Sequence, residues 1–426
     1  MSARAHRQTA QVCIGSAALP LAELTFVRDG RREFSDFVYD QRWLTHPDRF
    51  EVSPDLPLRE GHFNRRAPSA LDSAFHFALA DTEPDAWGER VIRRTHARRR
   101  AQDRTLGELT SFDFLVSVDD FSRIGALRLR DARGEFLGSG EDYRTPQFID
   151  LEHIYASTRA VERGTDTDAD LAYLRGKATS LGGLRPKCTV LEEDGFLAIG
   201  KFPSLNDTRS VVRGEVLALK LAERAGLMPA AARVVLLGQT PVAVIRRFDR
   251  TRDGARIPYL SGGSLLQARR DEDRAYTEVA DALRRVSADP VADVRLLWCR
   301  LIFNLLINNV DDHLWNVGVL HAGGGQWRLA EAFDLNPFPD RALESKTWLA
   351  EDSGPISSLK QLLEGAAYFG LTRAEAEAEA ARIAVEVARW REVATSRAVG
   401  LTEAELREFA PAFEHSEARA ARALAS

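Results

Sequence analysis

The chain has few cysteines and no long apolar run. Its three cysteines lie far apart and form no Cys-x-x-Cys pair, so neither a zinc site nor a disulfide framework is indicated. The longest apolar stretch, 296–307, is well short of the roughly twenty residues that span a bilayer, and the N-terminus shows no apolar signal core. We therefore expect a soluble cytoplasmic protein that does not enter a membrane.

Several sequence motifs are also absent. The chain contains no Gly-x-x-x-x-Gly-Lys-Ser/Thr, no Gly-x-Gly-x-x-Gly, no Gly-x-Ser-x-Gly and no His-Glu-x-x-His. The sequence therefore gives no motif support for a Walker-type nucleotidase, a Rossmann dehydrogenase, an α/β-hydrolase or a zincin. The net charge of −5 at pH 7 argues against a dedicated DNA-binding protein, because holding DNA phosphates needs a positive field.

Lysine is scarce as well, with arginine supplying nearly all of the 58 basic residues. This bias is explained more simply by genome composition than by mechanism, but it makes each lysine more informative. Lys187 and Lys201 fall in segments that carry further signals.

The length of 426 residues favours two or three folded parts, at roughly 100 to 200 residues per domain. We predict an α+β fold with an N-terminal α/β module at 1–150, a small lobe at 151–255 and a mainly helical C-terminal lobe at 256–426. The basic stretch at 85–100 is interpreted as a solvated helix face in preference to a nucleic-acid contact.

Two helix starts in the C-terminal lobe are recognisable from local sequence. Thr372 with Glu375, and Thr402 with Glu405, have the spacing of capping boxes, in which hydroxyl and carboxylate each bond a free backbone donor.

Polar side chains gather after the most apolar helix of the chain. Asp311 and Asn316 have the five-residue spacing of the catalytic aspartate and the metal-binding asparagine in protein kinases. Asp334 follows a predicted hairpin, where a kinase carries its second metal-binding carboxylate. The alternative is a polar loop in which Asp311 or Asp312 caps a turn and Asn316 bonds to the backbone. His313 taken alone is more often a structural histidine than a base.

A second group of signals lies upstream. Gly182 and Gly183 would let backbone amides approach phosphate oxygens. Lys201 ends a predicted strand, and Glu215 follows on a helix that we expect to end near Gly226. Each signal is weak alone, but glycine loop, lysine, glutamate, catalytic loop and second aspartate appear in the order of kinase parts.

At these residues the chain resembles the HipA family, serine/threonine kinase toxins of bacterial toxin–antitoxin pairs. The matching segments are Ser180–Lys187, Ala198–Lys201, Val244–Arg250, Asn309–Asn316 and Leu329–Asp334. The resemblance covers roughly residues 10 to 390 and implies a bilobal, protein-kinase-like core.

The resemblance also implies roles for individual residues. Asp311 would be the catalytic base, with His313 beside it. Asn316 and Asp334 would hold Mg²⁺, and Ser180 would be autophosphorylated. The residues expected to bind ATP are Gly182, Gly183, Lys187, Lys201, Glu215, Arg246, Arg247 and Phe248.

The family further implies a helix-turn-helix, HipB-like antitoxin as partner, DNA contact only through that antitoxin, and a protein substrate of translation such as an aminoacyl-tRNA synthetase. Trp315 stands where the family usually has lysine, which removes a cation from the catalytic loop. A catalytically silent, kinase-fold binding module that acts with the antitoxin in operon repression therefore stays an alternative.

Overall fold

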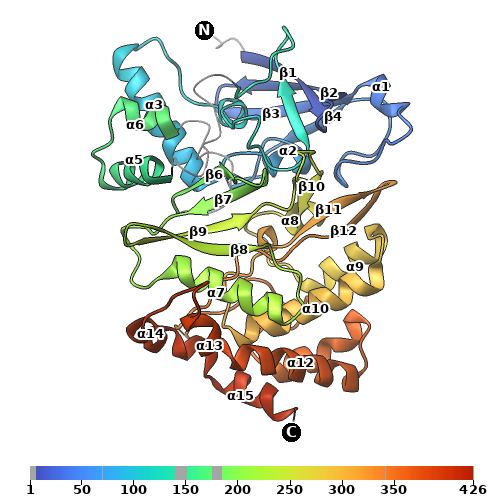
Figure 1. The fold of residues 1–426 in the computed structure, drawn as a ribbon. Helices are drawn as coiled ribbons and strands as arrows, with labels where there is room; N and C mark the ends of the chain where they lie inside the picture. The colour runs from blue at the N-terminus through green and yellow to red at the C-terminus, as the bar shows by residue number, and fades with distance from the viewer. Residues whose placement is uncertain (1–5, 70, 140–150, 175–184, 341, 426) are drawn as a thin grey trace. The chain divides into compact units, whose positions relative to one another are not determined.

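The computed structural model describes residues 6–69, 71–139, 151–174, 185–340 and 342–425. The chain divides into two units, whose elements Figure 1 labels. Unit 1 consists of Met1–Leu205 and Asp249–Leu260, and unit 2 of Asn206–Phe248 and Ser261–Ser426. The domain boundaries predicted at 150 and 255 stay predictions.

Each unit contains helices and strands. The elements of unit 1 are β1 (His6–Ile14), β2 (Leu19–Asp29), β3 (Arg32–Tyr39), α1 (Gln41–Leu44), β4 (Phe63–Arg66), α2 (Phe77–Ala80), α3 (Ala86–Gln102), α4 (Ser111–Val116), β5 (Leu127–Arg130), α5 (Leu151–Arg163), α6 (Asp168–Leu174), β6 (Lys187–Leu191) and β7 (Leu197–Lys201). Strand β10 (Tyr259–Ser261) falls at the boundary. The elements of unit 2 are α7 (Val211–Arg224), β8 (Ala232–Leu237), β9 (Thr240–Arg246), α8 (Gly262–Leu265), α9 (Tyr276–Val286), α10 (Pro290–Leu306), a 3₁₀ turn (Leu314–Asn316), β11 (Gly318–Gly323), β12 (Gln326–Leu329), α11 (Leu359–Gly365), a second 3₁₀ turn (Ala366–Phe369), α12 (Arg373–Ala388), α13 (Trp390–Thr395), α14 (Glu403–Phe413) and α15 (Ser416–Ala423).

A five-stranded antiparallel sheet in the order β4-β3-β2-β1-β5 forms the N-terminal part of unit 1. In β3, alternate residues toward its end are buried, the pattern of a strand with one face on a core. Phe26 of β2 and Phe37 of β3 are fully buried. The ring of Phe26 lies 5.8 Å from that of Phe75 and 5.7 Å from that of Phe112, so the segment between β4 and β5 completes the core of the sheet.

Helix α3 carries the basic stretch. The Asp85 side chain caps the helix by accepting a hydrogen bond from the Gly88 amide at 2.5 Å. Arg94 and Arg98 form ion pairs with Asp166, whose side chain is fully buried. Part of the basic stretch is therefore neutralised within unit 1.

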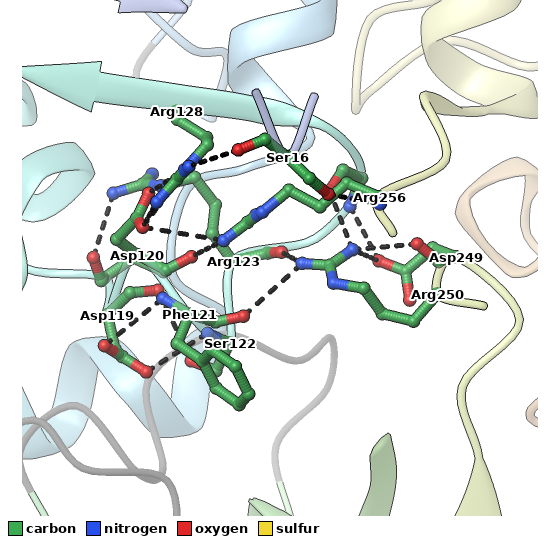
Figure 2. Close-up of polar contacts among 12 residues, drawn as sticks. Ser16, Asp119, Asp120, Phe121, Ser122, Arg123, Arg128, Asp249, Arg250 and Arg256 are labelled. Carbon is green, nitrogen blue, oxygen red and sulfur yellow. Dashed lines mark hydrogen bonds and ion pairs between the residues drawn. The ribbon is translucent and has the colours of Figure 1, made fainter. Parts of the chain in front are cut away.

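The segment 249–260 belongs to unit 1 through buried polar contacts (Figure 2). The Gly125 amide donates to Asp249 Oδ2 at 2.7 Å. Arg250 Nη1 donates to Asp249 Oδ2 at 2.9 Å and to the Gly125 carbonyl at 2.8 Å. Arg250 Nη2 donates to the Arg123 carbonyl at 2.6 Å. Asp249 and Arg250 are both buried, so the hydrogen bonds of this pair hold the segment in place away from water.

Asp120 lies between two further arginines in the same network (Figure 2). Arg128 Nε donates to Asp120 Oδ1 at 3.0 Å. Arg256 Nη2 lies 3.6 Å from Asp120 Oδ2 and also donates to the Asp120 carbonyl. The Arg256 amide donates to Ser16 Oγ at 3.1 Å, which ties the returning segment to the turn after β1.

Arg123 is the most deeply buried cation of this network. Its Nη2 donates to the carbonyl oxygens of Leu115 and Val118 at 3.0 and 2.9 Å. Burial lowers the pKa of Arg123 to about 10, and the nearby carboxylates of Asp120 and Asp119 oppose that shift. We refer to Asp119, Asp120, Arg123, Arg128, Asp249, Arg250 and Arg256 as the buried arginine network.

Helix α10 is the central helix of unit 2 and packs against α9, α11, α12 and α15. It begins with Pro290, and the Asp289 side chain caps it. Trp298, Ile302 and Leu306 are four residues apart and fully buried, so one whole face of the helix lies in the core.

The C-terminal helices begin where local sequence predicts. Both capping boxes are formed, with Thr372 and Glu375 at the start of α12 and Thr402 and Glu405 at the start of α14. Figure 1 shows α12 to α15, in red, lying together at the C-terminal end of unit 2. Within the described ranges, no helix combines the length and apolar composition that crossing a membrane requires.

Candidate active site

The predicted catalytic segment begins where α10 ends. Asn308 has a left-handed backbone conformation, with φ of 51°, which stops the helix and is tolerated by asparagine better than by most residues. Its Nδ2 donates to the carbonyl oxygens of Phe338 and Asp340 at 2.5 and 3.1 Å. The end of α10 is thereby joined to the chain beyond Asp334.

Asp311 and Asn316 are brought into direct contact. The 3₁₀ turn Leu314–Asn316 folds the chain back, and Asn316 Nδ2 donates to the Asp311 carbonyl at 2.7 Å. Because the amide nitrogen of Asn316 is used in this way, its Oδ1 is the atom available for another partner. The Asp311 side chain keeps 33% of its surface exposed, so its carboxylate is accessible from solvent.

Asp312, the neighbouring carboxylate, has a different environment. Its Oδ2 accepts a hydrogen bond from Ser345 Oγ at 2.7 Å, and its Oδ1 accepts one from the Lys346 amide at 2.7 Å. Burial raises the pKa of Asp312 to about 6, while these hydrogen bonds oppose the shift. The two adjacent aspartates therefore differ: the Asp312 side chain is buried and hydrogen-bonded to residues 345 and 346, whereas the Asp311 side chain is accessible to solvent.

His313 lies beside the carboxylate of Asp311. Its Nε2 lies 4.0 Å from Asp311 Oδ1. Burial lowers the pKa of His313, and the carboxylates of Asp311 and Asp334 oppose that shift. The cations of Lys346 and Arg270 reinforce it. Both candidate carboxylates and two cations therefore act on one imidazole, within unit 2.

Asp334 follows β12, and its own backbone is left-handed, with φ of 55°. Aspartate, like asparagine, adopts this conformation more readily than most residues other than glycine. Asn336 Nδ2 lies 3.3 Å from Asp334 Oδ1 and from its carbonyl oxygen. The Ala332 amide donates to the Met228 carbonyl at 2.9 Å, which fixes the chain just before Asp334.

The donor atoms suit a magnesium ion. Asn316 offers an amide oxygen and Asp334 a carboxylate, both hard oxygen ligands of the kind that Mg²⁺ prefers. Among the residues that the structure describes, no three histidine, cysteine, aspartate or glutamate side chains are grouped to hold a metal. A magnesium ion that takes one or two carboxylates and completes its shell with water and phosphate oxygens needs no such group.

The predicted nucleotide-binding residues are distributed over both units. Glu215 is buried in α7, and Phe248 lies after β9 with its ring 5.4 Å from that of Phe333. This contact connects the end of β9 to the residue before Asp334. Arg247 is buried, and Arg246 is the last residue of β9.

The two predicted lysines belong to unit 1. Lys201 is opposite Lys187 in the β6–β7 hairpin. Lys187 Nζ lies 3.2 Å from Asp85 Oδ2, and both side chains are almost completely buried. Burial raises the pKa of Asp85 to about 6, and Lys187 opposes that shift. Lys187 therefore supports the N-cap of α3, while its predicted role toward ATP stays a prediction, as does the pairing of Lys201 with Glu215. Ser180, Gly182 and Gly183 lie outside the described residues.

Sequence reasoning missed Lys346, Arg270 and Tyr276. Tyr276 OH donates to the Asp312 carbonyl at 2.7 Å, and the Arg270 guanidinium lies 4.0 Å from the centre of the Trp315 ring. All three residues lie thirty or more positions from their partners, so no local spacing could have found them. The scarcity of lysine was the one usable signal for Lys346.

The sequence matches the family model of the HipA-like C-terminal domain over residues 179–393. The chain therefore belongs to this family, which confirms the resemblance of the sequence motifs. A curated protein of Sinorhizobium fredii (strain NBRC 101917 / NGR234), named "Putative kinase Y4mE", is 26% identical over 326 residues, 70% of this chain and 71% of that protein.

The fold has a solved counterpart. HipA of the Shewanella oneidensis MR-1 toxin–antitoxin system, solved in complex with HipB and operator DNA, is similar over 97% of this chain and 96% of its own, with a TM-score of 0.68 and 17% identity. A likeness at this identity concerns the fold. It confirms the predicted α+β class with a mainly helical C-terminal part.

Proposed function

We propose that the chain is a Mg·ATP-dependent protein serine/threonine kinase. The observation that carries the proposal is the accessible carboxylate of Asp311, whose carbonyl accepts a hydrogen bond from Asn316, in a chain of the HipA-like family. The carboxylates of Asp311 and Asp334 both act on the pKa of His313. The name of the Sinorhizobium relative supports phosphoryl transfer as the reaction.

The chemistry follows from the properties of the side chains. The hydroxyl oxygen of the acceptor forms a bond to the γ-phosphorus of ATP, the bond from that phosphorus to the β–γ bridging oxygen breaks, and ADP leaves. Asp311 orients the hydroxyl and accepts its proton, which requires an accessible carboxylate. The burial of Asp312 excludes it from this role, since its oxygens already accept hydrogen bonds from Ser345 and the Lys346 amide.

Asn316 and Asp334 would hold the magnesium ion, which supplies compensation for the phosphate charge. Lys201, supported by Glu215, would bind the α and β phosphates, with Lys187 nearby. The backbone at 246–248 would receive the adenine.

The glycine loop would also regulate the enzyme. Gly182 and Gly183 would approach the phosphates. Phosphorylation of Ser180 in the same loop would add nearly two negative charges and compete with ATP for the same donors.

The partner and substrate class are proposed from the family and its solved member. The Shewanella HipA structure contains HipB and operator DNA, which supports a HipB-like helix-turn-helix antitoxin as partner here. With a net charge of −5, this chain is expected to reach DNA through that partner. The acceptor would be a protein of translation, such as an aminoacyl-tRNA synthetase, whose phosphorylation arrests growth.

Incubation of the purified chain with Mg·ATP tests the proposal. We expect intact-mass spectrometry to show addition of one phosphate, located by peptide mapping at Ser180, together with ADP formation. Asp311→Asn should lower both by at least about 10³-fold, because the neutral amide accepts no proton.

The control is Asp352→Asn, which removes an exposed carboxylate from a turn and should leave both signals unchanged. A wild-type chain that neither binds ATP nor forms ADP would refute the kinase assignment.

A second candidate, a silent binding module that acts in operon repression, is favoured by Trp315. This side chain packs against Gly263, where an added Cβ would lie 2.6 Å from the indole, and it stacks under Arg270. The catalytic loop thus carries an aromatic ring in place of a cation. This candidate predicts ATP binding without transfer, and ADP formation that disappears in Asp311→Asn would exclude it.

A further inference from the structure

Lys346 lies on the proposed catalytic carboxylate. Its Nζ donates to Asp311 Oδ1, although the two residues are far apart in sequence. The lysine side chain is 57% exposed and that of Asp311 is 33% exposed. An ion pair this accessible to solvent contributes little to stability on its own, so its position calls for another explanation.

The backbone that carries Lys346 is fixed by Asp312. The amide of Lys346 itself donates to Asp312 Oδ1 at 2.7 Å, and the Ser345 hydroxyl donates to Asp312 Oδ2 at 2.7 Å. Thr347 Oγ1 donates to the Asp312 carbonyl at 2.8 Å. Three consecutive residues are therefore bound to the residue next to Asp311, and Ser345, Thr347 and Asp312 are buried.

The chain beyond Lys346 is held on its other side. The Trp348 amide donates to the Arg274 carbonyl at 3.0 Å, the Tyr276 amide donates to the Trp348 carbonyl at 2.9 Å, and the Thr277 amide donates to the Leu349 carbonyl at 3.1 Å. Lys346 thus projects from a stretch of backbone that is hydrogen-bonded on both sides, within reach of Asp311.

The local charge balance shows what a cation does there. Asp311 and Asp334 both carry carboxyl groups, and the proposed reaction adds the charge of ATP phosphates. The catalytic loop itself supplies no cation, because its residues 314 and 315 are leucine and tryptophan. Lys346 and Arg270, both from outside the loop, act on the same imidazole as the two carboxylates.

We infer that Lys346 is a positioning residue for phosphoryl transfer. It holds Oδ1 of Asp311, leaves Oδ2 to accept the proton of the acceptor hydroxyl, and balances negative charge as the phosphoryl group moves. The inference rests on the proposed function, because it gives Lys346 a task only if Asp311 is the base. A group that acts mainly in the transition state changes kcat more than the KM for ATP.

The test compares Lys346→Met, Lys346→Arg and the control Lys360→Met with the wild type. Lys360 is also an exposed lysine paired with an acid, Glu364 in α11, so its substitution removes the same charge elsewhere. ADP formation and phosphate incorporation into the chain are measured over a series of Mg·ATP concentrations, and a melting curve is recorded for each variant.

We expect Lys346→Met to lower kcat about 10²-fold with a change of less than about 3-fold in the KM for ATP. Lys346→Arg should restore at least a tenth of the wild-type kcat, because it returns the charge, and Lys360→Met should match the wild type. A purely structural role would lower the melting temperature of Lys346→Met and would not separate kcat from KM.

Two other results would overturn the inference. Wild-type kcat in Lys346→Met would show that the ammonium takes no part in transfer, and a raised kcat would show that it masks Asp311. Both leave the kinase assignment standing, whereas absence of ADP formation by the wild type removes the proposed function and the inference together.

Discussion

Unit 1 and unit 2 each contain carboxylates paired with cations, but the pair at Asp249 in unit 1 is buried, whereas the pair at Asp311 in unit 2 is exposed to solvent. In the buried arginine network, Arg250 and Asp249 have side chains that are 2% and 5% exposed, and main-chain carbonyls satisfy much of the guanidinium. At the catalytic segment, Lys346 and Asp311 remain accessible. A buried cation must be fully bonded or it destabilises the fold, while an exposed one can exchange partners. The comparison indicates a structural role for the first cluster and leaves the second accessible for the chemistry proposed above.

The largest expected effect on stability comes from Arg123→Met. Methionine keeps an apolar stem but leaves the carbonyl oxygens of Leu115 and Val118 without their donor, so the free energy of unfolding should fall by about 3–5 kcal/mol. Urea titration followed by circular dichroism measures the loss. Arg133→Met, which removes an exposed arginine, is the control and should change stability by less than about 0.5 kcal/mol. A small loss in Arg123→Met would contradict the structural role of the network.

An intermediate effect is expected for Asp119→Asn, and it depends on pH. Burial raises the pKa of Asp119 to about 6, against hydrogen bonds from Ser122 and the Phe121 amide. Between about pH 6 and pH 4 the native protein therefore binds a proton that the unfolded chain, with an aspartate pKa near 3.9, does not. As the pH falls from about 6 to about 4, Asp119 raises the free energy of unfolding by about 1.4 kcal/mol per pH unit. This stabilisation is lost again as the pH rises through 6.

Unfolding of Asp119→Asn at pH 4.5, 5.5 and 6.5 tests that sign. The variant should lack the rise in the free energy of unfolding that Asp119 gives the wild type at low pH. The excess stability of the wild type over the variant should therefore shrink toward pH 6.5 or reverse. Asp352→Asn provides the control for a carboxylate in solvent. Parallel curves for Asp119→Asn and the wild type would show that Asp119 does not bind a proton in this range.

The smallest effect on stability is expected at the accessible pair. Lys346→Met should change the free energy of unfolding by less than about 1 kcal/mol, because solvent screens the pair, even though transfer falls strongly. The same urea titration measures it, with Lys360→Met alongside. A loss above about 2 kcal/mol would erase the contrast between the two clusters and assign Lys346 to the fold.

The features that the sequence predicted correctly are those whose residues lie close together along the chain. The capping boxes at Thr372 and Thr402 were predicted because each is complete within four residues. The strand predicted to end at Lys201 is formed as β7, and the hairpin predicted before Asp334 is formed by β11 and β12. Asn316 bonds to the Asp311 carbonyl, as the polar-loop alternative for this segment predicts, while the kinase roles of the two residues stay predictions.

The rest of the site depends on contacts that no local pattern encodes. Nothing near Asp312 indicates that it will be buried, or that 345–347 will bond to it. The left-handed backbone of Asp334 is not predictable from the residue type, since aspartate adopts this conformation at only a small share of its positions. Arg123 looks like any other arginine in an arginine-rich chain, and only the fold shows that it is buried.

The return of 249–260 to unit 1 determines how the chain can be divided for experiments. The chain passes from one unit to the other three times, after Leu205, after Phe248 and after Leu260. A fragment that starts at residue 179, where the family match begins, would carry Asp249 and Arg250 without Gly125 and Arg123, the residues that bond them. The charges of Asp249 and Arg250 would then lose their buried partners from residues 123 and 125, so we expect such a fragment to aggregate. Domain swaps within the family should therefore take residues 1–260 from a single parent.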